Sequence, residues 1–316
     1  MALATPSPTV SVIITTYNYD RFLDQSIASV LAQTRRPDEI LVVDDGSTDE
    51  TAATVARYAP AGVRYIVQAH RGGNAARNRG LRESRGALVA FLDADDWWAP
   101  DKLARQLAHL ARYPAAGLIT GGEWEVHAGR PPARVARKPV GAANLYPRLL
   151  VENCLGNTSL PLIRRACFAR VGGFDEGLAL GQDWDMWLRI ARAFPVGVVG
   201  GAPLLYFRRH AGSTTAGRVW ARFESNRAFQ RHYLAPVQPL WYRLWLLRAA
   251  EAMNAFYAAA ALVDDPRQRG VARRLAWRAA LLDPLYEPQQ KAGVLFRALF
   301  GRAAFDRMRG LLPRQG

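Results

Sequence analysis

Short apolar runs alternate with helix-patterned segments along the first 120 residues of this 316-residue chain. The apolar, β-branched runs predict buried strands at 10–15, 39–43, 63–67, 88–92 and 117–120. Apolar positions at helical spacing, with breaks at glycine, proline and aspartate, predict helices at about 23–31, 49–58, 72–84 and 101–113. Strands that alternate with crossover helices predict an α/β fold with a mostly parallel, doubly wound sheet.

The pattern changes after residue 120. A Pro-, Arg- and Gly-rich stretch at 129–139 predicts a surface loop, and the run at 203–207 predicts a last strand. From residue 218 onward the spacing is almost entirely helical, with breaks near 236–239, 264–266 and 283–288. We therefore expect one α/β domain at 1–217 and a helical, basic C-terminal extension at 218–316.

The positive charge is concentrated in that extension. The formal net charge is +15, and residues 218–316 contain 17 Lys or Arg against 7 Asp or Glu. Such an excess attracts a polyanion, which is a nucleic acid, an anionic membrane surface or a phosphorylated substrate. The alternative is arginine placed on solvated helix faces. No nucleic-acid reader module is recognisable, so we expect no nucleic-acid partner.

Residues 291–314 alternate apolar and arginine side chains. This pattern is typical of an amphipathic helix that lies on an anionic membrane. The alternative is that its apolar face packs on the rest of the chain.

The cysteines and the missing fingerprints exclude several classes of protein. Cys154 and Cys167 are too few for a disulfide framework or a zinc site, so we expect buried free thiols. Neither GxGxxG after the first strand nor GxxxxGK[ST] is present, which excludes the dinucleotide and Walker loops. No secretory signal or membrane-spanning run is visible, so we expect a cytoplasmic protein.

Three carboxylates follow the predicted strand at 88–92 directly. Asp93, Asp95 and Asp96 repel one another unless something neutralises them. Mg²⁺ or Mn²⁺ is the usual partner of such oxygen ligands and also binds phosphates. The alternative is an acidic turn that caps the following helix.

Other polar residues occupy strand ends and helix starts. Thr15 and Asp45 follow the first two strands, and the carboxyl ends of parallel strands meet at the ligand-binding edge of such a sheet. Arg77 lies in the first turns of a helix, where it can brace a phosphate. Asp183 is a helix N-cap or a general base. His210 is an ordinary surface or core residue, or a ligand.

Five motifs occur in a fixed order along the chain. They are VSVIITTYN at 10–18, LVVDDGSTD at 41–49, AARNRG at 75–80, AFLDADDW at 90–97 and GQDWDMWL at 181–188. Together they closely resemble the family-2 inverting glycosyltransferases of the GT-A fold, as found in bacterial surface-polysaccharide assembly. The resemblance covers about residues 8–212. It implies a nucleotide-binding half at about 8–120 and an acceptor half at about 121–217.

The resemblance implies roles for the residues that match the donor-site motifs. Thr15 and Tyr17 would line the base pocket, with Tyr17 stacking on the ring. Asp45 would bind the base, as with uridine-diphosphate donors, and Arg77 would lie near the nucleotide. Asp93 and Asp95 look like the family's DxD motif, with Asp95 as the main metal ligand.

The remaining matched positions concern the metal and the base. Asp96 is a neighbouring ligand candidate. His210 lies in YFRRHAGS at 206–213, which resembles a family element whose histidine contacts metal or diphosphate. Asp183 aligns with the catalytic base. The family often has Glu before it, whereas this chain has Gln182, which removes one nearby charge.

The resemblance therefore implies an inverting, Mn²⁺- or Mg²⁺-dependent transfer from a nucleoside-diphosphate sugar, with UDP as the expected nucleotide. The expected acceptor is a glycan or a lipid-linked glycan used in cell-surface polysaccharide synthesis. The expected location is the cytoplasm, or the inner face of the plasma membrane as a peripheral protein. The alternatives are a non-catalytic sugar-nucleotide- or glycan-binding relative and a nucleotidyltransferase, which would release pyrophosphate.

Overall fold

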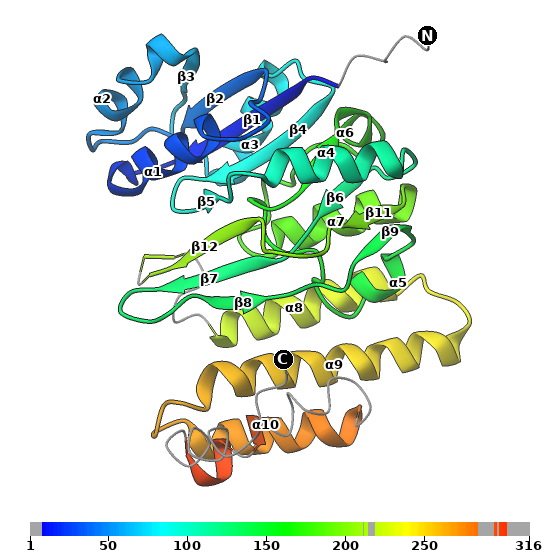
Figure 1. The fold of residues 1–316 in the computed structure, drawn as a ribbon. Helices are drawn as coiled ribbons and strands as arrows, with labels where there is room; N and C mark the ends of the chain where they lie inside the picture. The colour runs from blue at the N-terminus through cyan, green and yellow to red at the C-terminus, as the bar shows by residue number, and fades with distance from the viewer. Residues whose placement is uncertain (1–7, 211, 214–218, 284–293, 296, 302–316) are drawn as a thin grey trace. The chain divides into compact units, whose positions relative to one another are not determined.

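The computed structural model describes residues 8–210, 212–213, 219–283, 294–295 and 297–301 (Figure 1). The chain forms two compact units. The α/β unit contains residues 1–149 and 153–210, and the helical unit contains residues 150–152 and 211–316. We describe each unit by itself.

An eight-stranded sheet, in the order β3-β2-β1-β4-β10-β6-β11-β9, forms the centre of the α/β unit. Its first four strands are parallel: β1 (Val10–Thr16), β2 (Glu39–Asp44), β3 (Val63–Val67) and β4 (Leu88–Asp93). All four are confirmed within one residue of the sequence prediction. β1 is buried along its whole length because both faces of a parallel sheet are covered by helices.

The other half of this sheet is mixed. β10 (Leu162–Arg164) runs antiparallel to both β4 and β6 (Leu118–Thr120). β11 (Val196–Val198) is parallel to β6, and β9 (Val140–Ala143) is antiparallel to β11. The sheet is therefore entirely parallel only on the side formed by β1, β2, β3 and β4.

Short crossover helices connect these strands. The helices of the α/β unit are α1 (Asp20–Leu31), α2 (Thr51–Ala56), α3 (Gly73–Glu83), α4 (Lys102–Arg112), α5 (Tyr146–Leu149), α6 (Arg165–Val171) and α7 (Gln182–Ala193), with a 3₁₀ turn η1 (Ala59–Ala61). α3 packs tightly on β1 and β2 because Gly80 faces the sheet. A Cβ atom at this position would lie 2.3 Å from Cγ2 of Ile13. Glycine thus permits the close approach of helix and strand.

A second sheet, in the order β5-β12-β7-β8, corrects the sequence prediction for residues 129–139. Its strands are β5 (Trp97–Trp98), β12 (Leu205–Arg209), β7 (Glu123–His127) and β8 (Ala133–Val135). The predicted surface loop is wrong in two respects. β8 lies inside it and pairs antiparallel with β7, and the Arg137 side chain in it is only 11% exposed.

The helical unit contains α8 (Val219–Leu234), α9 (Leu240–Leu262) and α10 (Arg269–Leu282). Its core includes Met253, Phe256 and Leu275, which are buried together with small alanine side chains. The breaks predicted near 236–239 and 264–266 separate these three helices and are confirmed. None of the helices in the described parts of the chain is long and apolar enough to cross a membrane. The amphipathic segment predicted at 291–314 falls largely outside the described residues.

Candidate active site

The carboxyl ends of β1, β2 and β4 bring the first candidate residues together. In the parallel register Thr15 is opposite Asp93, and Thr16 is opposite Asp44. The Thr15 hydroxyl donates to Oδ1 of Asp93 at 3.2 Å. These residues therefore meet at the edge where parallel α/β sheets bind ligands.

Arg77 joins this group from α3. Its Nη2 lies 2.6 Å from Oδ1 of Asp93, and its Nη1 donates to Oδ1 of Asn74 at 3.1 Å. The residue is 6% exposed, and its Nε has no hydrogen-bond partner in the protein. The Thr158 hydroxyl donates to the other Asp93 oxygen at 2.9 Å. Asp93 is thus neutralised and held by the protein itself.

Asp45 is surrounded by donors from the segment after β3. Its Oδ1 accepts bonds from the backbone N–H of Arg71 at 2.9 Å and from the Gln68 amide at 2.7 Å. Its Oδ2 accepts the N–H of Gly72 at 2.7 Å and lies 2.9 Å from Nδ1 of His70. Asp45 is only 2% exposed. Asp45 therefore fixes the segment after β3 to the end of β2.

Tyr17 supplies an exposed ring next to the segment after β3. It is 40% exposed, and the imidazole of His70 stacks on it with centroids 4.1 Å apart. Asn18, which has a left-handed backbone (φ 55°), accepts the N–H of Thr48 through Oδ1 at 2.8 Å. The loops after β1 and β2 are thereby tied together, and Tyr17 is held beside Asp45.

Asp95 and His210 form the next contact. Oδ2 of Asp95 lies 3.0 Å from Nε2 of His210, and both side chains are less than one-fifth exposed. Burial and the negative charge of Asp93 raise the pKa of Asp95, while the bond from His210 opposes this shift. His210 also packs against Tyr19 and Phe22 of the α1 region.

The structure does not bring Asp96 to this pair. Asp96 is 1% exposed, and its carboxylate bonds to the Ser159 hydroxyl at 2.6 Å and to the N–H of Arg208 at 3.0 Å. Burial and the charges of Asp95 and Asp93 raise its pKa well above the usual value. Asp96 therefore joins the loop after β4 to β12 and is not exposed beside Asp95 and His210.

A divalent cation needs several donor atoms that lie close together. The described residues contain no group of three or more His, Cys, Asp or Glu side chains that would enclose a metal ion. Asp95 and His210, however, offer an oxygen and a nitrogen 3.0 Å apart. Adjacent ligands at about 2.1 Å in an octahedral shell are separated by about this distance. Asp95 and His210 would therefore be the residues that hold such a cation.

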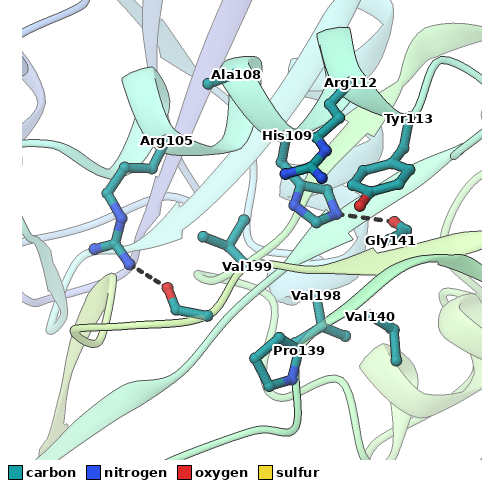
Figure 2. A pocket seen from close by; sticks show the side chains of 11 residues that line it. Arg105, Ala108, His109, Arg112, Tyr113, Pro139, Val140, Gly141, Val198 and Val199 are labelled. Atoms are coloured by element: carbon teal, nitrogen blue, oxygen red, sulfur yellow. Dashed lines mark hydrogen bonds between the residues drawn. The ribbon is translucent and has the colours of Figure 1, made fainter.

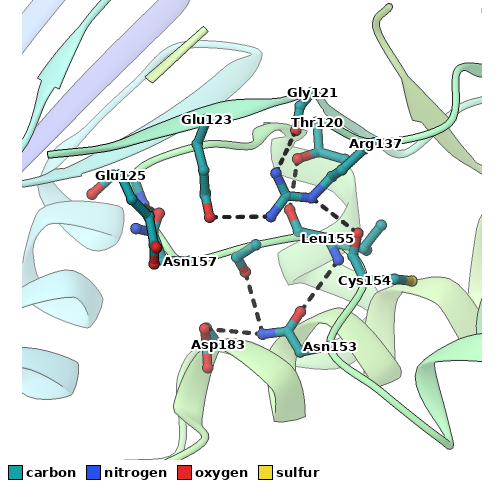
Figure 3. Close-up of polar contacts among 12 residues, drawn as sticks. Thr120, Gly121, Glu123, Glu125, Arg137, Asn153, Cys154, Leu155, Asn157 and Asp183 are labelled. Atoms are coloured by element: carbon teal, nitrogen blue, oxygen red, sulfur yellow. Dashed lines mark hydrogen bonds and ion pairs between the residues drawn. The ribbon is translucent and has the colours of Figure 1, made fainter. Parts of the chain in front are cut away.

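Asp183 lies in a separate polar group (Figure 3). The N-cap of α7 is Gly181 (φ 78°), so the N-cap interpretation of Asp183 is wrong. Asp183 lies in the first turn, where its Oδ1 accepts the N–H of Trp184 at 2.8 Å. The Asn153 amide donates to its Oδ2 at 3.1 Å. The carboxylate is partly buried and has a fixed orientation.

The neighbouring part of this polar group is an ion pair on the second sheet (Figure 3). Nη2 of Arg137 lies 3.4 Å from Oε1 of Glu123, and Arg137 also donates to the carbonyls of Gly121 and Cys154. The other Glu123 oxygen and Nδ2 of Asn157 are buried without a hydrogen-bond partner in the protein.

Sequence reasoning missed several residues of the site. Thr158, Ser159 and Asn153 lie in an irregular segment with no periodicity, and Arg208 comes from a strand of the second sheet. Ser159 accepts the N–H of Asp93 and donates to Asp96, so it sets the course of the acidic loop. A sequence signal existed only for Arg208, which lies in the element YFRRHAGS at 206–213.

A cavity of about 520 Å³ lies elsewhere in the α/β unit, between α4 and the strands β9 and β11 (Figure 2). Its walls include His109, whose Nε2 lies 2.8 Å from the carbonyl oxygen of Gly141. None of the candidate site residues lines it.

The fold and the site define a class of protein: an α/β nucleotide-binding fold with an acidic DxD-type loop at the sheet edge. The model of glycosyl transferase family 2 matches residues 11–156. An uncharacterized glycosyltransferase of Rickettsia prowazekii is 30% identical over 219 residues, which are 66% of this chain and 66% of that protein. The chain belongs to glycosyl transferase family 2.

Other similar proteins have more specific names. The Escherichia coli UDP-Glc:alpha-D-GlcNAc-diphosphoundecaprenol beta-1,3-glucosyltransferase WfgD is 28% identical over 185 residues, which are 58% of this chain and 70% of that protein. The matched part spans only 28% to 66% of the length of the first six curated relatives.

Solved structures share the fold at low sequence identity. S. aureus TarS 1–349 in complex with UDP-GlcNAc has a TM-score of 0.63 at 16% identity, covering 97% of this chain and 93% of that one. Mannosyltransferase PcManGT from Pyrobaculum calidifontis, in complex with GDP-Man and Mn²⁺, has a TM-score of 0.58 at 21% identity, covering 98% and 89%. These likenesses establish the GT-A-like fold.

Proposed function

We propose that this chain is an inverting glycosyltransferase that moves a sugar from a nucleoside-diphosphate donor to an acceptor hydroxyl. The observation that carries the proposal is the convergence of Asp45, Arg77, Asp93 and Asp95 at the carboxyl ends of three parallel strands. Family membership supports transfer chemistry, and the UDP-sugars named for WfgD and TarS support a UDP-linked donor.

The proposed donor site lies in residues 8–120. Tyr17 stacks on the base, and the carboxylate of Asp45 binds the edge of the base. Rings 4.1 Å apart leave no room for a base between Tyr17 and His70, so the base replaces the imidazole on Tyr17. Thr15 lines the base pocket with Tyr17. The guanidinium of Arg77 then lies near the diphosphate, where its positive charge offsets the negative charge that develops on the leaving group.

Asp95 and His210 are the proposed ligands of Mn²⁺ or Mg²⁺. The Mn²⁺ in the PcManGT structure agrees with this choice of metal. Such a cation would supply Lewis-acid stabilisation of the departing diphosphate. Arg208 orients the Asp95 loop by donating from Nε to the Asp95 carbonyl at 2.9 Å.

Asp183 is the proposed base on the acceptor side, which we assign to residues 121–217. Its Oδ2, held by Asn153, accepts the proton of the acceptor hydroxyl as that oxygen attacks the anomeric carbon. One displacement inverts the carbon, so an α-linked donor gives a β-glycoside. The name of WfgD supports a lipid-linked acceptor. We therefore propose that the reaction takes place at the inner face of the plasma membrane.

The test is a thermal-shift screen of sugar nucleotides with Mn²⁺ or Mg²⁺ on the full chain. We expect UDP-sugars to raise the melting temperature, because a ligand that binds only the folded state stabilises it. Asp95→Asn should remove the metal-dependent part of the shift, and Asp45→Ala should remove the nucleotide-dependent part. A chain that no sugar nucleotide stabilises would contradict the proposed donor site.

A further inference from the structure

Exposed apolar side chains are concentrated in the helical unit. Of the twelve large apolar side chains that are exposed among the described residues, ten belong to this unit. Scattered single apolar residues are normal on a surface, whereas a contiguous group marks an interaction site. The largest group is at the start of α9 and the end of α10.

We name this group the aromatic patch. It consists of Leu240, Trp241, Leu244 and Trp245 on α9, and Trp277 and Leu281 on α10. Trp241 is 71% exposed and Leu281 is 72% exposed. At about 100° per residue, the four α9 positions fall within about 140° of the helix circumference. They therefore share one face.

Hydrogen bonds join the two helices at the patch. Arg248, which lies on the same face of α9, donates from Nε to the carbonyl of Leu282 at 2.6 Å and from Nη2 to that of Leu281 at 3.1 Å. The start of α9 and the end of α10 are thus adjacent. The two sets of apolar side chains form one surface with an arginine between them.

The charge around the patch is mostly positive, although Glu251 of α9 pairs with Arg278 of α10 at 2.8 Å and Asp283 follows α10 directly. α10 carries four arginines and no acidic residue, and α9 carries two arginines in its first nine residues. Arg273 and Arg274 are exposed one turn before Trp277. Tryptophan prefers the membrane–water interface, and arginine binds anionic headgroups through a side chain whose apolar part can remain in contact with lipid.

We propose that the aromatic patch docks the enzyme on an anionic membrane surface. The tryptophans insert at the headgroup level while Arg248, Arg273 and Arg274 bind lipid phosphates. No membrane-spanning helix is required, because apolar contact and charge together hold an interfacial helix. The inference rests on the surface chemistry of α9 and α10, and it complements the proposed lipid-linked acceptor.

A second copy of the chain is the competing occupant. A two-fold interface places the same patch on both partners. Arginines outnumber acidic residues on α9 and α10, and the one acidic residue of α9, Glu251, already pairs with Arg227 and Arg278, so two copies would bring net positive charge together. This like-charge contact disfavours self-association through the patch and favours the membrane.

Vesicle co-sedimentation of the full chain tests the proposal. We expect binding to phosphatidylcholine vesicles that contain phosphatidylglycerol, and weaker binding in 0.5 M salt, which shortens the range of charge attraction to a few ångströms. Trp241→Ala with Trp245→Ala should lower the partition coefficient by at least about tenfold. Arg273→Gln with Arg274→Gln should lower it at low salt and have less effect at high salt.

The matched control is Val67→Ala, which changes an exposed apolar residue of the α/β unit. It should bind vesicles like the unchanged protein. Equal binding by the double tryptophan variant, or no vesicle binding by the unchanged chain, would overturn the proposal. So would light scattering that shows a dimer converted to a monomer by the same variant.

Circular dichroism and the melting temperature establish that the variants fold, which is expected because Trp241 and Trp245 are more than half exposed. Transfer to a water-soluble acceptor should be unchanged in every patch variant. If vesicle binding follows the patch but no sugar nucleotide is turned over, the proposed function fails and the membrane surface stands.

Discussion

The ion pair between Arg77 and Asp93 should contribute to the free energy of unfolding, and the burial of the two side chains sets the size of this contribution. The side chains are 8% and 28% exposed, and the closest atoms are 2.6 Å apart. Arg77→Met removes the positive charge and leaves Asp93 with two hydroxyl donors beside Asp95. Breaking a fully buried pair costs about 3–5 kcal/mol, and the partial exposure of Asp93 reduces this to about 2–4 kcal/mol. Asp93→Asn should cost a similar amount because it leaves the buried guanidinium unpaired.

The double variant measures the interaction between the two side chains apart from their contacts with other residues. Arg77→Met with Asp93→Asn has no unpaired charge, so it should recover about 1–3 kcal/mol relative to the sum of the single changes. Hydrogen exchange of β1 and β4 peptides in a urea series measures the stability of the α/β unit without contributions from the helical unit. Additive single changes would refute the reasoning.

The control for this cycle lies on the same helix. Arg79 forms an exposed ion pair with Glu83 at 2.9 Å, with side chains 44% and 35% exposed. Surface pairs contribute little because solvent screens them, so Arg79→Met should change the stability by less than about 0.5 kcal/mol. A loss as large as that of Arg77→Met would show that helix packing, not the buried pair, explains the effect.

Three further predictions concern packing, the metal and a thiol. Gly80→Ala should destabilise the α/β unit by about 1–3 kcal/mol, because the added methyl group would clash with β1. Gly270 has open space around it, so Gly270→Ala should stabilise α10 by up to about 1 kcal/mol. Urea unfolding measures both changes. Asp95→Asn should weaken Mn²⁺ binding measured by calorimetry, whereas Asp96→Asn should retain it; equal losses would restore Asp96 as a ligand. Burial raises the pKa of Cys167 to about 12, so at pH 8 about one molecule in 10⁴ is a thiolate and iodoacetamide should label it only after unfolding. The stabilising contribution of this raised pKa is complete below about pH 8.5, the unfolded value, and is lost as the pH rises towards about 12.

The first half of the fold was predictable because its signals are local. β1, β2, β3 and β4 are short, mostly apolar runs, and aspartate ends β2 and β4. The second sheet was not predictable in this way. β5 has two residues, and β8 is mostly exposed, so neither carries a burial pattern that a sequence can show. In addition, β5 pairs with β12, a segment more than 100 residues away along the chain.

The same distinction applies to the candidate site. Residues at the ends of predicted strands, such as Thr15 and Asp93, meet because parallel strands end at one edge. The separation of Asp96 from Asp95 was not predictable, since it depends on Ser159 and on the backbone of Arg208, which come from distant segments. Three adjacent carboxylates look equivalent in a sequence, and only their tertiary partners distinguish an anchor from an open ligand.

The central claim is that Asp183 acts as the base in sugar transfer from a nucleoside diphosphate. The most direct measurement is nucleoside-diphosphate release from a UDP-sugar with acceptor and Mn²⁺, made on the unchanged chain and on Asp183→Asn. We expect the variant to bind UDP with nearly unchanged affinity in calorimetry and its turnover rate to fall by about 10²–10⁴-fold. Unchanged turnover in Asp183→Asn, or release of pyrophosphate in place of the diphosphate, would contradict the central claim.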